Sequence, residues 1–81
     1  MIRTVEATRA EALFVSAVQA SEAPGADQVR LAVATALRLL GVQGCAAQVA
    51  GEYGDHPDTA AARMSWALGA VRGAYVGPAR V

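Results

Sequence analysis

Several residue types are scarce in this 81-residue chain, and each scarcity excludes a class of protein. A single cysteine, Cys45, excludes an internal disulfide and is typical of a reducing compartment. Aromatic residues make up only 5% of the chain and about a quarter of it is alanine, so its hydrophobic residues bury little area each. A core this thin favours an oligomeric partner, because chains of this length are seldom well stabilised by their own core.

Net charge is also lacking, because seven arginines balance seven acidic residues and lysine is absent. Neither half of the chain carries a basic excess of the kind that draws proteins to nucleic acid or to membrane surfaces. The apolar run at residues 12–18 is too short to span a bilayer, and Glu6 and Glu11 precede it where a signal peptide is basic. We therefore expect a single soluble, cytoplasmic domain over residues 1–81, with no membrane segment.

Hydrophobic periodicity predicts an all-α domain of three or four short helices. The turn formers at residues 21–25 separate the first two helices. The predicted helices and their inward residues are 4–20 with Ala7, Ala10, Phe14, Ala17 and Val18; 27–40 with Val29, Val33, Ala36, Leu37 and Leu40; 45–53 with Ala46, Val49, Ala50 and Tyr53; and 57–75 with Ala60, Met64, Ala67, Leu68, Val71 and Tyr75.

The helix predicted over residues 27–40 has the clearest limits. Asp27 is suited to the N-cap or to the first turn, and Gly41 follows where a glycine commonly ends a helix. The face opposite the predicted core carries Arg30 and Arg38. Leu31 lies with them, as an apolar side chain that stays exposed unless something covers it.

Residues 46–64 resemble a helix-turn-helix. The resemblance depends on Ala50, a small residue where two helices would cross closely, and on Gly54, which can adopt a positive φ in the turn. Residues 57–64 are similar to the start of the recognition helix in the promoter-reading domain of sigma factors. The resemblance implies helix-turn-helix geometry over residues 45–75, with residues 27–40 as the supporting helix.

The element Gly54-Asp55-His56-Pro57 also resembles a Gly-Asp-His-Pro element in a set of short actinobacterial helical proteins, which implies no activity. Its residue types indicate the start of a helix, because proline suits the first helical position. The ring of His56 or the carboxylate of Asp55 can cap free backbone N–H groups there. We therefore expect Gly54, Asp55, His56 and Pro57 to form the turn and the cap.

The helix-turn-helix resemblance implies a DNA-associated function, as a small transcriptional regulator or accessory factor that acts as a dimer. The expected DNA contacts are Thr59, Arg63 and Arg72, and Arg63 is the outward side chain best able to reach base edges or phosphates. Three or four phosphate contacts per chain predict weak, steeply salt-dependent binding.

A helical protein-interaction or self-association module is the alternative. Trp66 lies at helical spacing among the small residues Ala62, Gly69, Ala70 and Gly73. A large aromatic side chain among small neighbours lets a second helix approach closely and can act as an interface anchor. A further alternative packs Trp66 inside the domain, against the N-terminal segment.

Catalytic and metal chemistry have little support in the sequence. Cys45 and His56 could form a nucleophile and base, but no glycine-rich oxyanion loop accompanies them. A metal site would have to gather Cys45, Asp55, His56 and Asp58 in an unfavourable geometry. We therefore expect no catalytic residue, metal, cofactor or small-molecule substrate, and a partner that is DNA or protein, including a second copy of the chain.

Overall fold

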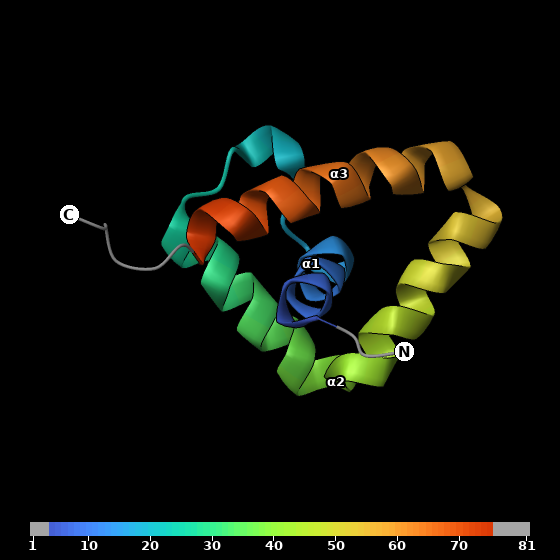
Figure 1. The fold of residues 1–81 in the computed structure, drawn as a ribbon, viewed down its shortest axis with the longest axis horizontal. Coiled ribbons are helices and arrows are strands. Elements are labelled where there is room, and N and C mark those ends of the chain that lie inside the picture. The colour runs from blue at the N-terminus through green and yellow to red at the C-terminus, as the bar shows by residue number, and fades with distance from the viewer. Residues whose placement is uncertain (1–3, 76–81) are drawn as a thin grey trace.

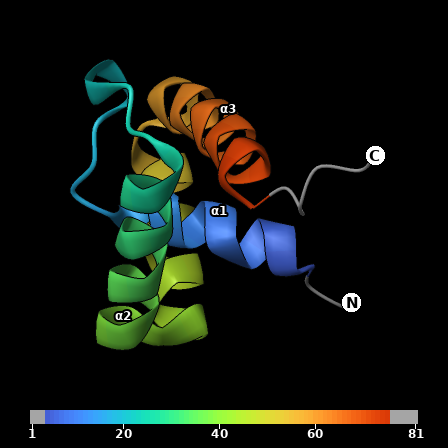
Figure 2. The same cartoon turned by 90° about the vertical axis from the view of Figure 1, so that its left-hand side faces the viewer.

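The computed structural model describes residues 4–75, which fold into three α-helices and one short 3-10 helix without a strand. In chain order these are α1 (Val5–Val15), η1 (Ala20–Glu22), α2 (Ala26–Asp55) and α3 (Pro57–Ala74). The two halves of α2 and α3 form three sides of a triangle, and α1 runs through its middle (Figure 1). Figure 2 shows α1 crossing α2 steeply, with α3 above both. The predicted all-α class is confirmed.

Helix α1 is shorter than the helix predicted over residues 4–20. It begins after Thr4, whose Oγ1 accepts a hydrogen bond from the Ala7 backbone N–H at 3.0 Å. It ends at Val15, because Ser16 is extended and its hydroxyl donates to the Leu13 carbonyl oxygen at 2.6 Å. Ala17 is consequently exposed instead of facing the core, which corrects the predicted inward face.

Helix α2 bends at Gly41, where the sequence predicts a helix end. Gly41 has φ 72° and ψ 171°, a conformation that only glycine adopts readily. The first half, before Gly41, buries Val29, Val33 and Ala36 as predicted, and Leu37 packs against them. The inward placement of Leu40 is wrong, because that side chain is 38% exposed. The second half is longer than predicted and reaches Asp55 without an intervening loop.

The junction between α2 and α3 lies at His56 and not at Gly54. Gly54 has helical backbone angles, whereas His56 has φ −141° and ψ 68°. Ala50, which was expected to lie where the helices cross, is exposed. Both of these predictions are wrong, and a single-residue junction differs from the three- or four-residue turn that joins a helix-turn-helix pair. Helix-turn-helix geometry is therefore not confirmed.

The predicted helix start is confirmed, although the predicted side-chain cap is not. Pro57 occupies the first turn of α3, and Asp58 adds a carboxylate near the positive end of the helix dipole. His56 is the N-cap residue, but no side-chain cap hydrogen bond forms there, so neither Asp55 nor His56 caps α3 as expected. The His56 backbone carbonyl oxygen instead accepts from the Ala60 N–H at 2.8 Å.

The core lies where α1 meets both of the other helices. It consists of small and medium side chains: Ala10, Ala12, Leu13, Phe14, Val29, Val33, Ala36, Cys45, Val49, Ala60, Ala67, Val71 and Ala74. Val49 faces this core as predicted, whereas Tyr53 is exposed and lies beside Phe14, with ring centroids 6.5 Å apart. The predicted inward residues of α3 are confirmed, since Ala60, Ala67 and Val71 are buried and Met64, Leu68 and Tyr75 pack against them.

By length and composition alone, α2 is apolar enough to cross a membrane. Only 28% of its most apolar stretch is buried within the domain, so much of that apolar surface faces outward. The helix bends at Gly41 and packs against α1 and α3. Some of its outward apolar residues, such as Leu31 and Leu39, line the candidate site described below.

Candidate protein-interaction groove

Arg63 lies across the end of α1, and its guanidinium replaces the next helical turn as a hydrogen-bond donor. It donates to four backbone carbonyl oxygens: from Nε to Phe14 at 2.7 Å, and from one terminal nitrogen to Val18 at 2.9 Å, Ser16 at 3.1 Å and Leu13 at 3.4 Å. The last carbonyls of a helix have no partner within it and attract a positive charge. Arg63 therefore fixes both the end of α1 and the segment that follows.

The assignment of Arg63 to the outward face of its helix is wrong. Its guanidinium carbon lies 4.9 Å from the centroid of the Trp66 ring and 5.7 Å from that of Phe14, within cation–π range. Burial lowers the pKa of the Arg63 guanidinium below its ordinary value. Trp66 is half-buried over this group, which matches the alternative that packs it inside the domain.

The other expected DNA contacts lie apart from Arg63. Thr59 is exposed in the first turn of α3. Arg72 lies in the last turn of α3, where its Nε donates to Oε2 of Glu6 in α1 at 2.6 Å. The structure therefore does not bring Thr59, Arg63 and Arg72 together as one basic surface, and their DNA role stays a prediction.

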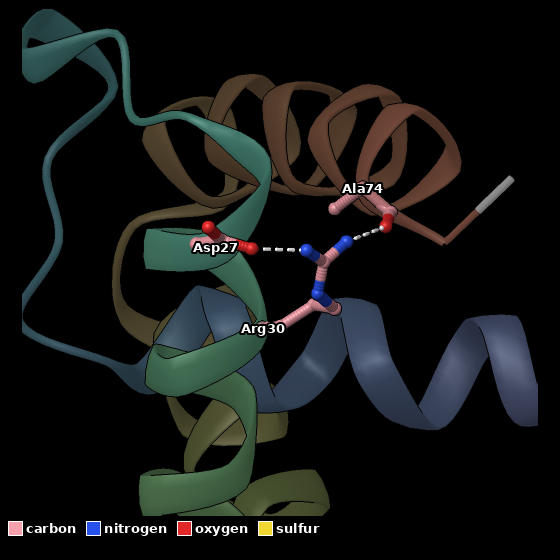
Figure 3. A network of polar contacts seen from close by, with 3 residues as sticks. All are labelled: Asp27, Arg30 and Ala74. Atoms are coloured by element: carbon pink, nitrogen blue, oxygen red, sulfur yellow. Dashed lines mark hydrogen bonds and ion pairs between the residues drawn. The ribbon is translucent and has the colours of Figure 1, made fainter.

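Arg30 binds the C-terminal end of α3, as Arg63 binds the C-terminal end of α1. Its guanidinium donates to the Ala74 carbonyl oxygen at 2.5 Å and pairs with Asp27 one turn earlier in its own helix (Figure 3). Arg9 lies over the ring of Tyr75, 3.9 Å from its centroid. Most of the described arginines thus hold one helix against another.

The small-residue face proposed for a partner is only partly open. Ala62, Gly69 and Gly73 are exposed, whereas Trp66 and Ala70 are half-buried against the core. Neither glycine has a neighbour within 4 Å of the position a side-chain Cβ would take. Because Trp66 covers Arg63, this face lacks the exposed aromatic side chain that was expected to anchor a partner. The role of the face in binding stays a prediction.

A different surface is both hollow and apolar. It is an apolar groove of about 550 Å³ between the end of α1, the first half of α2 and one residue of the second half. Its lining consists of Val15, Ser16, Ala17, Val18, Gln28, Leu31, Ala32, Thr35, Ala36, Leu39, Leu40 and Gln48. None of these residues carries a charge, so the groove suits an apolar occupant.

Exposed leucines form the rim of the apolar groove. Leu31 is 66% exposed and Leu39 is 75% exposed. With Thr35 between them they follow a spacing of four residues, which places all three along one face of α2. Single exposed apolar residues are ordinary, but apolar residues gathered around a hollow are typical of an interaction site.

A second cleft continues from one end of the apolar groove. It shares Val15 and Gln48 with the groove and is also lined by Phe14, Gly51, Glu52, Asp55 and Arg63. The guanidinium of Arg63 is directed to backbone carbonyls, and no side-chain hydrogen bond or ion pair of Glu52 or Asp55 occurs in the described part of the chain. The groove therefore leads from an apolar stretch to an end where the two carboxylates of Glu52 and Asp55 lie beside the guanidinium of Arg63.

The residues considered for catalysis or metal binding are not brought together. Cys45 is buried, and His56 is exposed at the far end of the same helical half, about 16 Å along its axis. Within residues 4–75, no group of three or more His, Cys, Asp or Glu side chains is arranged to hold a metal ion. These side chains therefore supply no assembled centre.

Sequence reasoning identified Leu31 as exposed but missed the apolar groove. One wall of the groove is formed by Ser16, Ala17 and Val18, which were assigned to a continuous helix. The other wall follows the face of α2 that carries Leu31 and Leu39. The sequence did contain a signal for this groove: Leu31 and Leu39 form a second apolar stripe on α2, beside the stripe that faces the core.

In comparisons with models of protein families, with curated proteins and with solved structures, the chain has no match.

Proposed function

We propose that this chain is a non-enzymatic protein-interaction domain that receives an apolar helix of a partner in the apolar groove. The observation that carries the proposal is the uncharged lining of the groove together with the exposed leucines on its rim, Leu31 and Leu39. A helix with apolar residues every three to four positions fits such a groove, as in other helix-in-groove recognition. The rim leucines would then lose contact with water on binding.

The two carboxylates at the end of the apolar groove add a preference for charge. Glu52 and Asp55 are exposed and line the continuing cleft. A basic residue at one end of the partner helix would meet these carboxylates. The partner is therefore an amphipathic helix with an apolar stripe and a basic end.

A direct test titrates the ¹⁵N-labelled chain with a synthetic amphipathic peptide, followed by NMR. The peptide has leucines every three to four residues, arginines near one end, and alanine and glutamine elsewhere. We expect saturable shifts of the amides along the groove, including those of Ala17, Leu31 and Leu39. A peptide of the same composition in scrambled order, which has no apolar stripe, is the control.

Matched variants make this titration specific. Leu39→Gln removes an exposed apolar group from the rim and should weaken peptide binding by roughly tenfold or more. Val5→Gln is the control, because Val5 is similarly exposed at 63% but lies at the opposite end of α1. Equal affinity of both variants for the peptide, or no saturable binding, would contradict the proposal.

The regulator hypothesis predicts a different result. DNA binding would fall steeply with rising salt, because it depends on phosphate contacts. A mobility shift of duplex DNA at low salt, with Arg72→Ala as the variant, tests it. A salt-sensitive shift that Arg72→Ala abolishes, together with no peptide binding, would favour the regulator over the interaction domain.

A further inference from the structure

We propose that the occupant of the apolar groove is a second copy of this chain, bound about a two-fold axis with Arg38 of each copy facing Glu52 and Asp55 of the other. The inference rests on the proposed function, since it names the partner of the same groove. In a two-fold dimer one surface must carry both the protruding and the receiving parts. The apolar and the charged residues of this face meet that condition separately.

The apolar part of the face is self-complementary. Leu31 and Leu39 protrude from the first half of α2, and the hollow that they border is lined by uncharged residues of the same face. Thr35 lies midway between the two leucines. A two-fold contact across this face would bring Leu31 and Leu39 of each copy against the uncharged lining of the other, which shields all four leucines from water.

The charged part of the face supplies a basic group. Arg38 follows Leu31 by seven residues, so the two share a face of α2, and Arg38 immediately precedes Leu39. Its side chain is exposed and makes no hydrogen bond or ion pair within residues 4–75. The other arginines of that part of the chain are each engaged inside the domain: Arg9 with Tyr75, Arg30 with Asp27 and Ala74, Arg63 with the end of α1, and Arg72 with Glu6.

The same face supplies the opposite charge. Glu52 and Asp55 line the cleft that continues the groove and have no side-chain partner in the described part of the chain. A second copy therefore brings an arginine beside an apolar stripe to a groove that ends in two carboxylates. The net charge of the whole chain is zero, so two copies do not repel each other overall. Their electrostatic complementarity comes from the positions of the individual charges.

The charges also argue against other occupants. A membrane surface rich in anionic lipid would attract Arg38 but repel Glu52 and Asp55, so the charges of this face give it no net attraction there. The phosphates of a nucleic acid likewise gain no net attraction from these charges, and an uncharged groove offers them no contact. A second copy offers both the apolar area and the basic group.

Sedimentation velocity on the full chain, over about 10 µM to about 1 mM, tests the proposal. We expect a monomer–dimer equilibrium that moves toward monomer in Arg38→Glu and in the double variant Glu52→Arg/Asp55→Arg, with dissociation constants raised at least fivefold. An equimolar mixture of the two variants should regain association, because each supplies the charge that the other lacks. Asp58→Arg, which reverses an exposed acid outside the groove, is the matched control.

The outcomes separate this inference from the proposed function. A chain that stays monomeric up to the highest concentration, yet binds the amphipathic peptide in its groove, overturns the second copy and leaves the interaction domain standing. A chain that does neither overturns both. A dimer whose dissociation constant is unchanged by both charge reversals also overturns the proposal of a second copy. So does a chain that stays monomeric and floats with vesicles of phosphatidylglycerol and phosphatidylcholine.

Discussion

The Nε of Arg63 donates a hydrogen bond to the carbonyl oxygen of Phe14 at 2.7 Å, joining α3 to the end of α1 across 49 residues of sequence. The same guanidinium holds the Ser16 and Val18 carbonyls. Ser16 and Val18 form one wall of the apolar groove. Arg63 is therefore a positioning residue, because it shapes a binding surface through the backbone that it anchors.

Removal of this arginine should destabilise the domain. Arg63→Met leaves several partly buried carbonyls without a charged donor, and we expect a loss of about 2–3 kcal/mol in the free energy of unfolding. Arg63→Lys keeps the charge but not the planar fork, so it should recover less than half of that loss. Urea denaturation measures both. Arg38→Ala, at an exposed arginine without a described partner, should change stability by less than about 0.5 kcal/mol at protein concentrations where the chain is monomeric, and an equal loss there would contradict the anchoring role.

Two glycines of α2 should respond in opposite directions to replacement by alanine. Gly41→Ala puts a side chain on a backbone at φ 72° and ψ 171° and should cost about 1–3 kcal/mol. Gly54→Ala lies in regular helix with nothing within 4 Å of the added Cβ, and should stabilise by about 0.5–1 kcal/mol. Thermal unfolding followed by circular dichroism compares them. A turn at Gly54 would instead make Gly54→Ala the damaging variant.

Local signals account for the parts of the fold that the sequence predicts well. Gly41 ends a periodic stretch, as a glycine after a helix commonly does, and Pro57 stands in the first turn of α3. The end of α1 carries no such signal. It is fixed by Ser16 together with Arg63, which is far away in the sequence and was assigned to the outward face of α3. A helix end set by a distant side chain cannot be found from periodicity.

The same error hid the candidate site. Leu31 was recognised as an exposed apolar residue, because its position on the helix opposes the core. The groove beside it exists only because the chain leaves the helical path at Ser16, so that Ala17 and Val18 face α2 across an open space. Periodicity assigns residues to faces of one helix, and it carries no information about which irregular segment lies opposite.

The N-cap of α1 offers a small and well-defined test of local structure. Thr4→Ala removes the hydroxyl that accepts from the Ala7 N–H and should cost about 1 kcal/mol. Thr59→Ala is the matched control, because Thr59 is exposed and forms no side-chain hydrogen bond within the described residues. Chemical denaturation should show a lower midpoint for Thr4→Ala alone. Equal midpoints for the two variants would mean that the hydroxyl of Thr4 contributes nothing to α1.

The buried thiol of Cys45 should make stability fall in alkaline solution. Burial, and after it the negative charge of Glu11, raises the pKa of the Cys45 thiol above its ordinary value of 9.0. The unfolded chain therefore loses this proton at a lower pH than the folded chain, so the stabilisation is complete below about pH 9 and is lost as the pH rises further. The slope contributed by one proton is at most about 1.4 kcal/mol per pH unit.

Urea denaturation from about pH 7 to about pH 10.5 measures this dependence in the unchanged chain and in Cys45→Ala. The variant loses packing at every pH, because Cys45 is 1% exposed, but its free energy of unfolding should fall less steeply above pH 9. The difference between the two curves isolates the thiol, since every other side chain is the same in both proteins. Parallel curves, or rapid reaction of Cys45 with a thiol reagent in the folded chain, would contradict a buried thiol whose pKa is raised.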